Sequence, residues 1–214
     1  MTAIKTYPKQ MLLAVGSMIS TGAYFYIANT YAITYATTSG KLTRGEILTA
    51  VLISAVVAAV SLPYFGHLGQ RFGRRKMILI GLAATGLWIF SIFSAIDTGN
   101  IAIVIPTLAV GAVCLAIGYG PLATFISELF DARVRFSAAS TTFQVGVLLG
   151  GALAPIIATA LVAATGRSLY VALYVAALSV VSFVSVFLVT STDVERGSRD
   201  MDPVQKRDSS HIPI

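Results

Sequence analysis

Two long apolar blocks of the chain are joined by the segment Gly66-His67-Leu68-Gly69-Gln70-Arg71-Phe72-Gly73-Arg74-Arg75-Lys76. The segment combines four cations with three glycines, whereas the blocks on either side carry almost no charge. A short basic connection between apolar blocks is typical of a loop at a membrane surface. We therefore expect two helical spans that meet at a tight turn, in which Gly66 and Gly73 let the backbone reverse direction.

The composition predicts an all-α integral membrane protein. Of 214 residues, 56% are hydrophobic and only 11% are charged, and the mean hydropathy is +0.82. The apolar runs are continuous rather than alternating, which favours helices over barrel strands. We predict a bundle over residues 11–190, a cytoplasmic segment over residues 1–10 and a disordered cytoplasmic tail over residues 191–214. The six predicted spans cover residues 11–37, 47–65, 77–95, 101–126, 137–164 and 168–190.

The distribution of cations predicts the orientation in the membrane. Segments on one side of the predicted spans hold twelve Lys and Arg residues, and segments on the other side hold three. By the positive-inside rule both termini are expected to be cytoplasmic in the plasma (inner) membrane. The net charge of +6 is explained by the positive-inside bias and by attraction to an anionic leaflet of the lipid bilayer, and it needs no nucleic-acid partner.

The spacing within the basic segment is more specific than its charge. Gly66, Gln70, Arg71, Gly73 and Arg75 form a pattern that resembles the signature loop of the major facilitator superfamily, found between the second and third helices and again between the eighth and ninth. In that family an Asp usually stands where this chain has Gln70, and it helps to lock one conformation. Gln70 keeps the hydrogen-bonding ability without the charge.

The resemblance implies a cytoplasmic gate that also involves Arg74. We hypothesise that Glu128, at the end of the fourth span, pairs with Arg71 or Arg74 when the cytoplasmic side is closed. The alternative is a solvated charge that contributes about 0–1 kcal/mol. Arg133 and Arg135 follow Glu128 in the sequence and complete the expected gate set.

A second passage narrows the family. It begins with Gly118-Tyr119-Gly120-Pro121, continues through residues 127–135 and ends in a span that contains Gln144 and Gly151. This passage resembles the tenth and eleventh helices of the metabolite:proton symporters, which carry organic acids, betaines and related solutes by alternating access. The resemblance implies that this chain corresponds to the C-terminal six-helix half of a twelve-helix transporter.

Uncharged polar side chains are the candidates for a solute cavity. Tyr24 and Tyr31 share one face of the first span, and Asn29 lies on a neighbouring face. Tyr119 and Gln144 are the candidates in the fourth and fifth spans. Each of these side chains could instead hydrogen-bond or pack between helices, since an unpaired amide in lipid is costly.

Small residues and prolines are expected to shape the fourth and fifth spans. In the fourth span, two glycines before a proline weaken the helix and favour a bend. In the fifth span, two glycines four residues apart allow close helix contact. These packing or bending residues are Gly118, Gly120, Pro121, Gly146, Gly150 and Pro155.

Several function classes receive no support from the sequence. There is no enzyme motif such as HExxH or GxSxG, and we expect no catalytic residue, cofactor or metal. The predicted spans carry no Asp, Glu, Lys, Arg or His except at their margins, so a proton-coupling group is expected on a second six-helix half. The alternatives to transport are a split or truncated half that is inactive alone, and a six-helix scaffold or channel. A homodimer could also supply the facing wall.

Overall fold

The computed structural model describes residues 8–130 and 135–189. Within these ranges six helical segments are long and apolar enough to cross a membrane, and no strand occurs. The predicted fold class is thereby confirmed. The predicted tail and most of the N-terminal segment lie outside the described residues. The elements are α2 (Pro8–Tyr26), η1 (Ile27–Tyr31), α3 (Ala32–Thr38), α4 (Arg44–Phe72), α5 (Arg74–Asp97), α6 (Ile101–Glu128), α7 (Arg135–Val147), η2 (Leu148–Ala152), α8 (Ala154–Thr165) and α9 (Leu169–Leu188).

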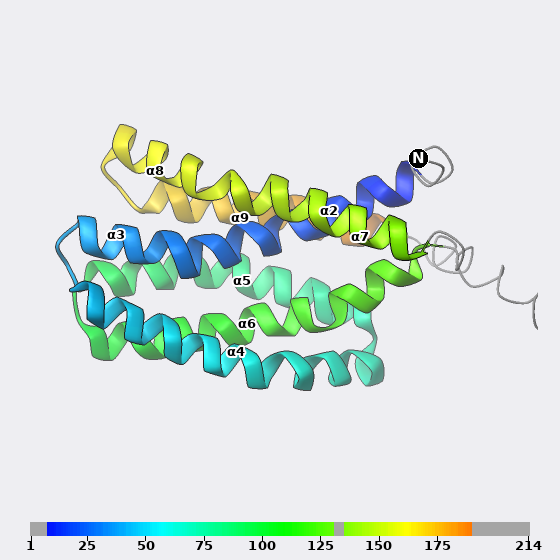
Figure 1. Cartoon of the computed structure of the whole chain (residues 1–214), viewed down its shortest axis with the longest axis horizontal. Helices are drawn as coiled ribbons and strands as arrows, with labels where there is room; N and C mark the ends of the chain where they lie inside the picture. The colour runs from blue at the N-terminus through cyan, green and yellow to red at the C-terminus, as the bar shows by residue number, and fades with distance from the viewer. Residues whose placement is uncertain (1–7, 131–134, 190–214) are drawn as a thin grey trace, which may run out of the picture.

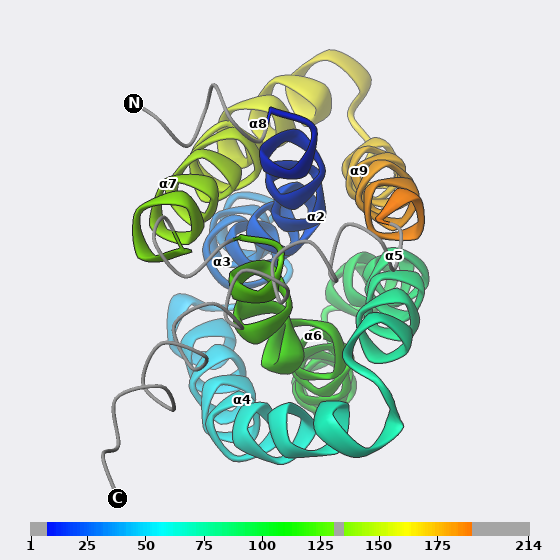
Figure 2. The ribbon, with the colours of Figure 1, turned by 90° about the vertical axis from the view of Figure 1, so that its right-hand side faces the viewer.

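The spans run up and down in one elongated bundle (Figure 1). The first span comprises α2, η1 and α3, and the fifth comprises α7, η2 and α8. Viewed end-on, α6 lies between α4 and α5, while α2 lies between α7 and α9 (Figure 2). Helix α2 begins and helix α9 ends at the end of the bundle that holds the α4–α5 connection (Figure 1). We call this the basic end.

The predicted turn at residues 66–76 is mostly wrong. Helix α4 continues through Phe72, helix α5 begins at Arg74, and only Gly73 departs from helical geometry, with φ 92° and ψ 117°. Gly66 lies inside α4 and contacts α6 instead, with its backbone so near that a Cβ on Gly120 would lie 2.7 Å from the Gly66 amide nitrogen. The glycine that reverses the chain is Gly73, whose positive φ is unfavourable for other residues.

Glycines bring α6 close to both of its neighbours. A Cβ on Gly120 would lie 2.7 Å from the amide nitrogen of Gly66 in α4, and Gly69 faces the Pro121 ring in a similar way. On the α5 side, Gly81 lies directly against the backbone of Gly118. Lipid tails are as apolar as the side chains, so the hydrophobic effect does not drive these helices together. The close approach of their backbones supplies the dispersion contacts that do.

Both interrupted spans contain a π-helical turn. In η1 the Ala32 amide donates to the carbonyl of Ile27, five residues earlier. In the fifth span, Pro155 has no N–H to offer the carbonyl of Gly151, and η2 lies just before it. Pro155 therefore removes one helical hydrogen bond beside the irregular turn. Such π turns are frequently found at functional sites.

A serine hydroxyl joins α2 to α9. Ser182 donates to the carbonyl of Gly16 (2.6 Å) and accepts from the amide of Ser20 (3.0 Å). In a regular α-helix the Ser20 amide would donate directly to the Gly16 carbonyl, four residues earlier. The Ser20 and Ser179 hydroxyls form a further hydrogen bond of 2.7 Å. The polar contacts fix α9 against the first span within the apolar bundle.

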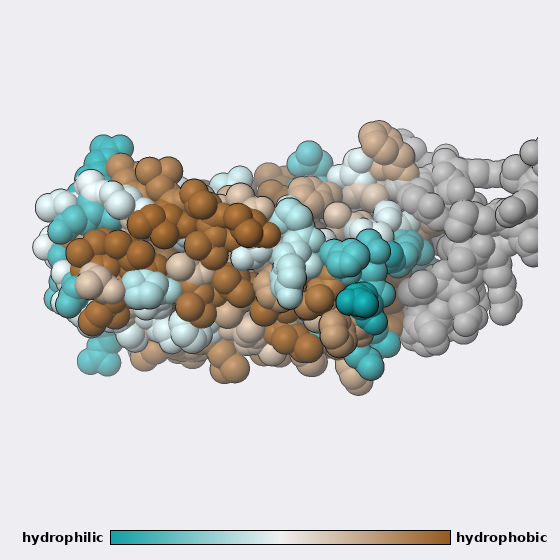
Figure 3. Space-filling view, turned by 90° about the horizontal axis from the view of Figure 1, so that it is seen from below, coloured by the Kyte–Doolittle hydropathy of each residue, from teal (hydrophilic) through white to brown (hydrophobic). Residues whose placement is uncertain are grey.

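The outer surface is apolar, as a membrane protein requires. Leu52, Val56 and Val60 on α4 are 66%, 67% and 71% exposed. In the space-filling view, hydrophobic residues cover most of the visible length and polar residues gather toward the ends (Figure 3). Such a surface would be unfavourable in water and favourable in hydrocarbon. The chain is therefore an integral membrane protein.

Candidate functional site

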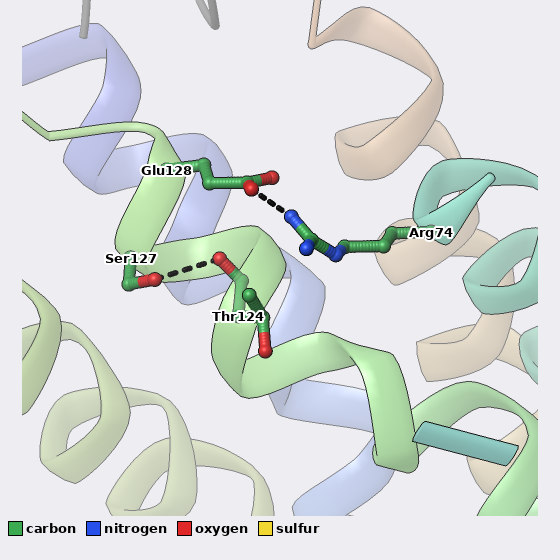
Figure 4. Close-up of polar contacts among 4 residues, drawn as sticks. All are labelled: Arg74, Thr124, Ser127 and Glu128. Carbon is green, nitrogen blue, oxygen red and sulfur yellow. Dashed lines mark hydrogen bonds and ion pairs between the residues drawn. The ribbon is translucent and has the colours of Figure 1, made fainter. Parts of the chain in front are cut away.

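An ion pair links α5 to α6 at the basic end. Arg74 is the first residue of α5, and its guanidinium contacts the Glu128 carboxylate at the end of α6 (Figure 4). Ser127 donates its hydroxyl to the carbonyl of Thr124 (2.8 Å), which satisfies that carbonyl within the last turns of α6. The two charged side chains are 26% and 40% exposed, so solvent partly screens their attraction.

The next residue of α5 contacts a different helix. Arg75 donates from Nη2 to the carbonyl oxygen of Phe187 (2.5 Å), and its guanidinium lies 5.6 Å from the centre of the Phe187 ring. A cation at a helix C-terminus is favourable because the last carbonyls have no intrahelical partner. Arg74 and Arg75 therefore tie the start of α5 to the ends of both α6 and α9. The α9 partner was not anticipated from the sequence.

The other residues of the expected gate lie around this corner. Gln70 and Arg71 are exposed in the last turns of α4. Gln70 forms no hydrogen bond within the described part of the chain. Arg133 lies outside the described residues, and Arg135 begins α7.

Exchanging the charges of the corner pair is expected to preserve its contribution to stability. Glu128→Gln and Arg74→Gln each lose an interaction of up to about 1 kcal/mol, because the pair is partly exposed. The double exchange Arg74→Glu with Glu128→Arg restores attraction, and 1 M salt weakens it. Denaturant unfolding in detergent micelles measures the coupling energy of the double-mutant cycle. Additive single effects would show that the pair contributes nothing, and Arg71→Gln serves as the charge-matched control.

An aromatic hollow opens between α2, α6 and α7. Its volume is about 190 Å³. Phe25 is 49% exposed, and the rings of Tyr119 and Phe143 lie 6.5 Å apart between their centres. Thr21 contributes a hydroxyl, and none of the described residues that line the hollow is charged. The lining residues of this aromatic hollow are Met18, Thr21, Gly22, Phe25, Tyr26, Leu115, Tyr119, Phe143 and Val147.

A second, more polar hollow of about 270 Å³ adjoins the first between α6 and α7. Phe143 lines both hollows, while Ser140 and Gln144 give the second one its polar groups. Gln144 is exposed on the surface of the six-helix bundle. Its amide therefore has access to a facing molecule rather than to the interior of this bundle.

Gly146 and Gly150 lie on the side of the fifth span that faces the first. A Cβ on Gly146 would overlap Met18, and a Cβ on Gly150 would overlap the carbonyl of Ile19. A Cβ on Gly22 would lie 3.2 Å from the Gly151 amide nitrogen. These glycines together allow the close spacing of the two spans beside the aromatic hollow.

The three cavity candidates in the first span do not line the aromatic hollow. Tyr24 is buried in the core of the bundle at 1% exposure, and Tyr31 is buried with its hydroxyl 3.3 Å from the carbonyl of Ala158. Asn29 donates its side-chain amide to the carbonyl of Phe25 (2.9 Å). The polar face of the first span that the sequence predicted to line a cavity is thus mostly buried inside the six-helix bundle. The face that lines the hollow holds Thr21 and Phe25, and their spacing of four residues was the available signal.

A carboxylate that the sequence interpretation left aside joins three spans at the end opposite the basic end. Asp97 accepts hydrogen bonds from the Tyr35 hydroxyl (2.8 Å) and the Ser168 hydroxyl (2.9 Å). The three residues come from α5, α3 and the start of α9. Tyr35 also stacks edge-on against Phe93, with ring centres 5.6 Å apart. Asp97 therefore fastens the bundle at this end.

Removing this carboxylate is expected to loosen the bundle more than removing either hydroxyl. Asp97→Ala loses both hydrogen bonds, whereas Tyr35→Phe and Ser168→Ala lose one each. Asp97 is exposed whereas Ser168 is buried, and we expect about 1–2 kcal/mol for Asp97→Ala and roughly half of that for each single hydroxyl. Denaturant unfolding of the three variants checks the ranking, and equal stability of Asp97→Ala and the wild type would refute the fastening role.

Comparisons with known proteins identify relatives. The sequence profile described as Major Facilitator Superfamily matches residues 12–210. The inner membrane metabolite transport protein YhjE of Escherichia coli (strain K12) is 29% identical over 198 residues, which are 89% of this chain and 44% of that protein. The proline/betaine transporter of the same organism is 28% identical over 181 residues, 84% of this chain and 36% of that protein.

A third relative is the glycine betaine/proline/ectoine/pipecolic acid transporter OusA of Dickeya dadantii (strain 3937). It is 27% identical over 187 residues, which are 86% of this chain and 36% of that protein. The aligned region thus spans less than half the length of each of these relatives.

Proposed function

Because the chain belongs to the major facilitator superfamily, we propose that it forms one six-helix wall of a transporter that moves a small metabolite by alternating access. The aromatic hollow supports this proposal most directly. Thr21 and Leu115 lie near the middle of their spans, and solute sites of such transporters lie near the bilayer midplane between two repeats. Helix α6 continues from the hollow to the basic end, where Glu128 pairs with Arg74 of α5.

The chemistry of the hollow favours a small solute with apolar or cationic parts. Phe25, Tyr119 and Phe143 supply aromatic faces, which attract ammonium groups as well as apolar surface. Thr21 and Gln144 supply neutral hydrogen-bonding groups. We propose an organic acid, a betaine or a similar metabolite, in agreement with the names of the relatives.

We propose that the group that couples transport to protons lies on the facing wall. The carboxylates of the described residues, Glu46, Asp97 and Glu128, all lie near helix ends, whereas a coupling group must reach the translocation path. We propose that a second six-helix half, or a second copy of this chain, completes the cavity. The cluster of cations at the basic end supports placing that end, and both termini, on the cytoplasmic side of the inner membrane.

Reconstitution tests the proposal. Purified chain alone is expected to give no uptake of radiolabelled glycine betaine or proline into proteoliposomes with an inward proton gradient. The chain joined to the N-terminal six helices of a relative is expected to restore uptake. Proton-dependent uptake by the monomeric chain would refute the need for a facing wall. Absence of uptake in every assembly, over a panel of organic acids and betaines, would favour a six-helix scaffold instead.

A further inference from the structure

A groove with little polar character runs along the outer surface between α5 and α9. It encloses about 340 Å³. Its floor is made by Gly86 and Ser179, which are so close that a Cβ on Gly86 would lie 2.9 Å from the Ser179 Cβ. Leu87 and Phe183 rise beside this floor and are 73% and 36% exposed. We call this feature the α5–α9 groove.

The shape of the groove suits a hydrocarbon chain. On α5 it extends from Leu82 to Phe90, and the eight helical steps between these residues correspond to roughly 12 Å. Small residues on both helices leave the crevice unfilled by side chains of the protein. Within a bilayer the molecule that meets such a surface is a lipid, and the class of lipid depends on the groups at the mouth of the groove.

Two cations stand in line with the groove toward the basic end. Arg75 and Lys76 precede Leu82 and Ala83 by seven residues each, so they lie on the same face of α5, two turns or roughly 10 Å away. Arg75 already donates to the carbonyl of Phe187. Lys76 is exposed and forms no ion pair within the part of the chain that the structure describes.

The opposite wall of the groove continues to the same cations. Phe187 follows Phe183 by four residues on α9, so the two rings lie on one face, one turn apart. The Arg75 guanidinium lies 5.6 Å from the centre of the Phe187 ring. An apolar surface therefore leads from the groove to the pair of cations, which matches the outline of a phospholipid with a charged head and an apolar chain.

We propose that the α5–α9 groove binds an acyl chain of an anionic phospholipid whose phosphate contacts Lys76. The neighbouring Arg75 adds positive potential and shapes the mouth of the groove through Phe187. A basic site between membrane-spanning helices favours anionic over zwitterionic lipids, and one lysine near the surface changes the preference by about fivefold.

Quenching of tryptophan fluorescence by brominated lipids tests this site. The chain has a single tryptophan, and Trp88→Phe gives a silent background. Leu87→Trp then places a reporter at the groove, and Val56→Trp places a matched reporter on exposed α4. Dibrominated phosphatidylglycerol is expected to half-quench the reporter at position 87 at a mole fraction about fivefold lower than dibrominated phosphatidylcholine does. The reporter at position 56 is expected to show no preference.

Charge removal separates the proposed site from general attraction to the surface. Lys76→Gln is expected to abolish the preference at position 87, whereas Arg71→Gln, which removes one cation from the same end, leaves it intact. Equal quenching by both lipids at position 87, or a preference that survives Lys76→Gln, would overturn the proposal. Protection of position 87 from both lipids, together with a dimeric mass, would show instead that a second copy covers the groove.

Discussion

Replacing Gly81 with alanine is expected to destabilise the bundle more than any other single methyl addition between α5 and α6. A Cβ at this position would overlap the amide nitrogen and Cα of Gly118 and would lie 3.1 Å from the carbonyl carbon of Ile117. Backbone atoms cannot turn aside as a side chain can, so the two helices must separate. Overpacking of this kind costs about 1–3 kcal/mol, measurable by denaturant unfolding in detergent micelles.

Two further alanine variants make this expectation specific. Gly118→Ala is expected to cost less than Gly81→Ala, because its Cβ would lie 3.3 Å from the Gly81 Cα. Gly45→Ala has open space around it and is expected to be neutral or to stabilise α4 by up to about 1 kcal/mol. If Gly81→Ala unfolds at the same denaturant concentration as the wild type, the close contact between α5 and α6 is not required for stability.

Loss of the Tyr119 ring is expected to reduce solute uptake by a completed transporter about tenfold or more. Tyr119 lies on α6 beside Phe143 and lines the aromatic hollow. A tenfold loss in uptake below saturation corresponds to about 1.4 kcal/mol of lost stabilisation of the rate-limiting transport step relative to free solute and protein. The measurement is initial uptake by the fusion described above, with Tyr119→Leu compared with the parent at equal protein density.

Companion variants separate the ring from its hydroxyl and from general damage. Tyr119→Phe retains the aromatic face and is expected to lose less uptake than Tyr119→Leu. Tyr170→Leu, at an exposed position in the first turn of α9, is expected to keep uptake within about twofold of the parent, less than 0.5 kcal/mol. Unchanged uptake by Tyr119→Leu would place the solute outside the aromatic hollow.

The helix ends show which boundaries the local sequence predicts and which it does not. The fourth span was predicted over residues 101–126 and is observed over Ile101–Glu128. Its start was predictable because Asn100 accepts a hydrogen bond from the Ala102 amide and so begins the helix. The second span was predicted to end at residue 65 and instead continues to Phe72. The sequence does not distinguish a glycine inside a helix from a glycine in a turn. Only the tertiary structure shows that Gly66 lies inside α4, in contact with Gly120 of α6.

The candidate site shows the same limit. The sequence indicated Tyr119, which does line the aromatic hollow, and it indicated Glu128 as a partner for the basic segment, where the structure pairs it with Arg74. It gave equal weight to Tyr24, which the structure buries at 1% exposure. Hydrophobic periodicity identifies faces of a helix, and in a membrane both lipid and protein interior are apolar, so the pattern does not say which face turns inward.

By itself the sequence determined the number of spans, their helical nature and the position of the basic segment, because these follow from the length of apolar runs and from local charge. Only the tertiary structure decided which surfaces meet. The contact of Gly81 with Gly118, the bridge from Ser182 to Gly16 and the fastening of Tyr35 to Asp97 join residues that are far apart along the chain. Such contacts depend on the three-dimensional fit of whole helices, and no local pattern encodes that fit.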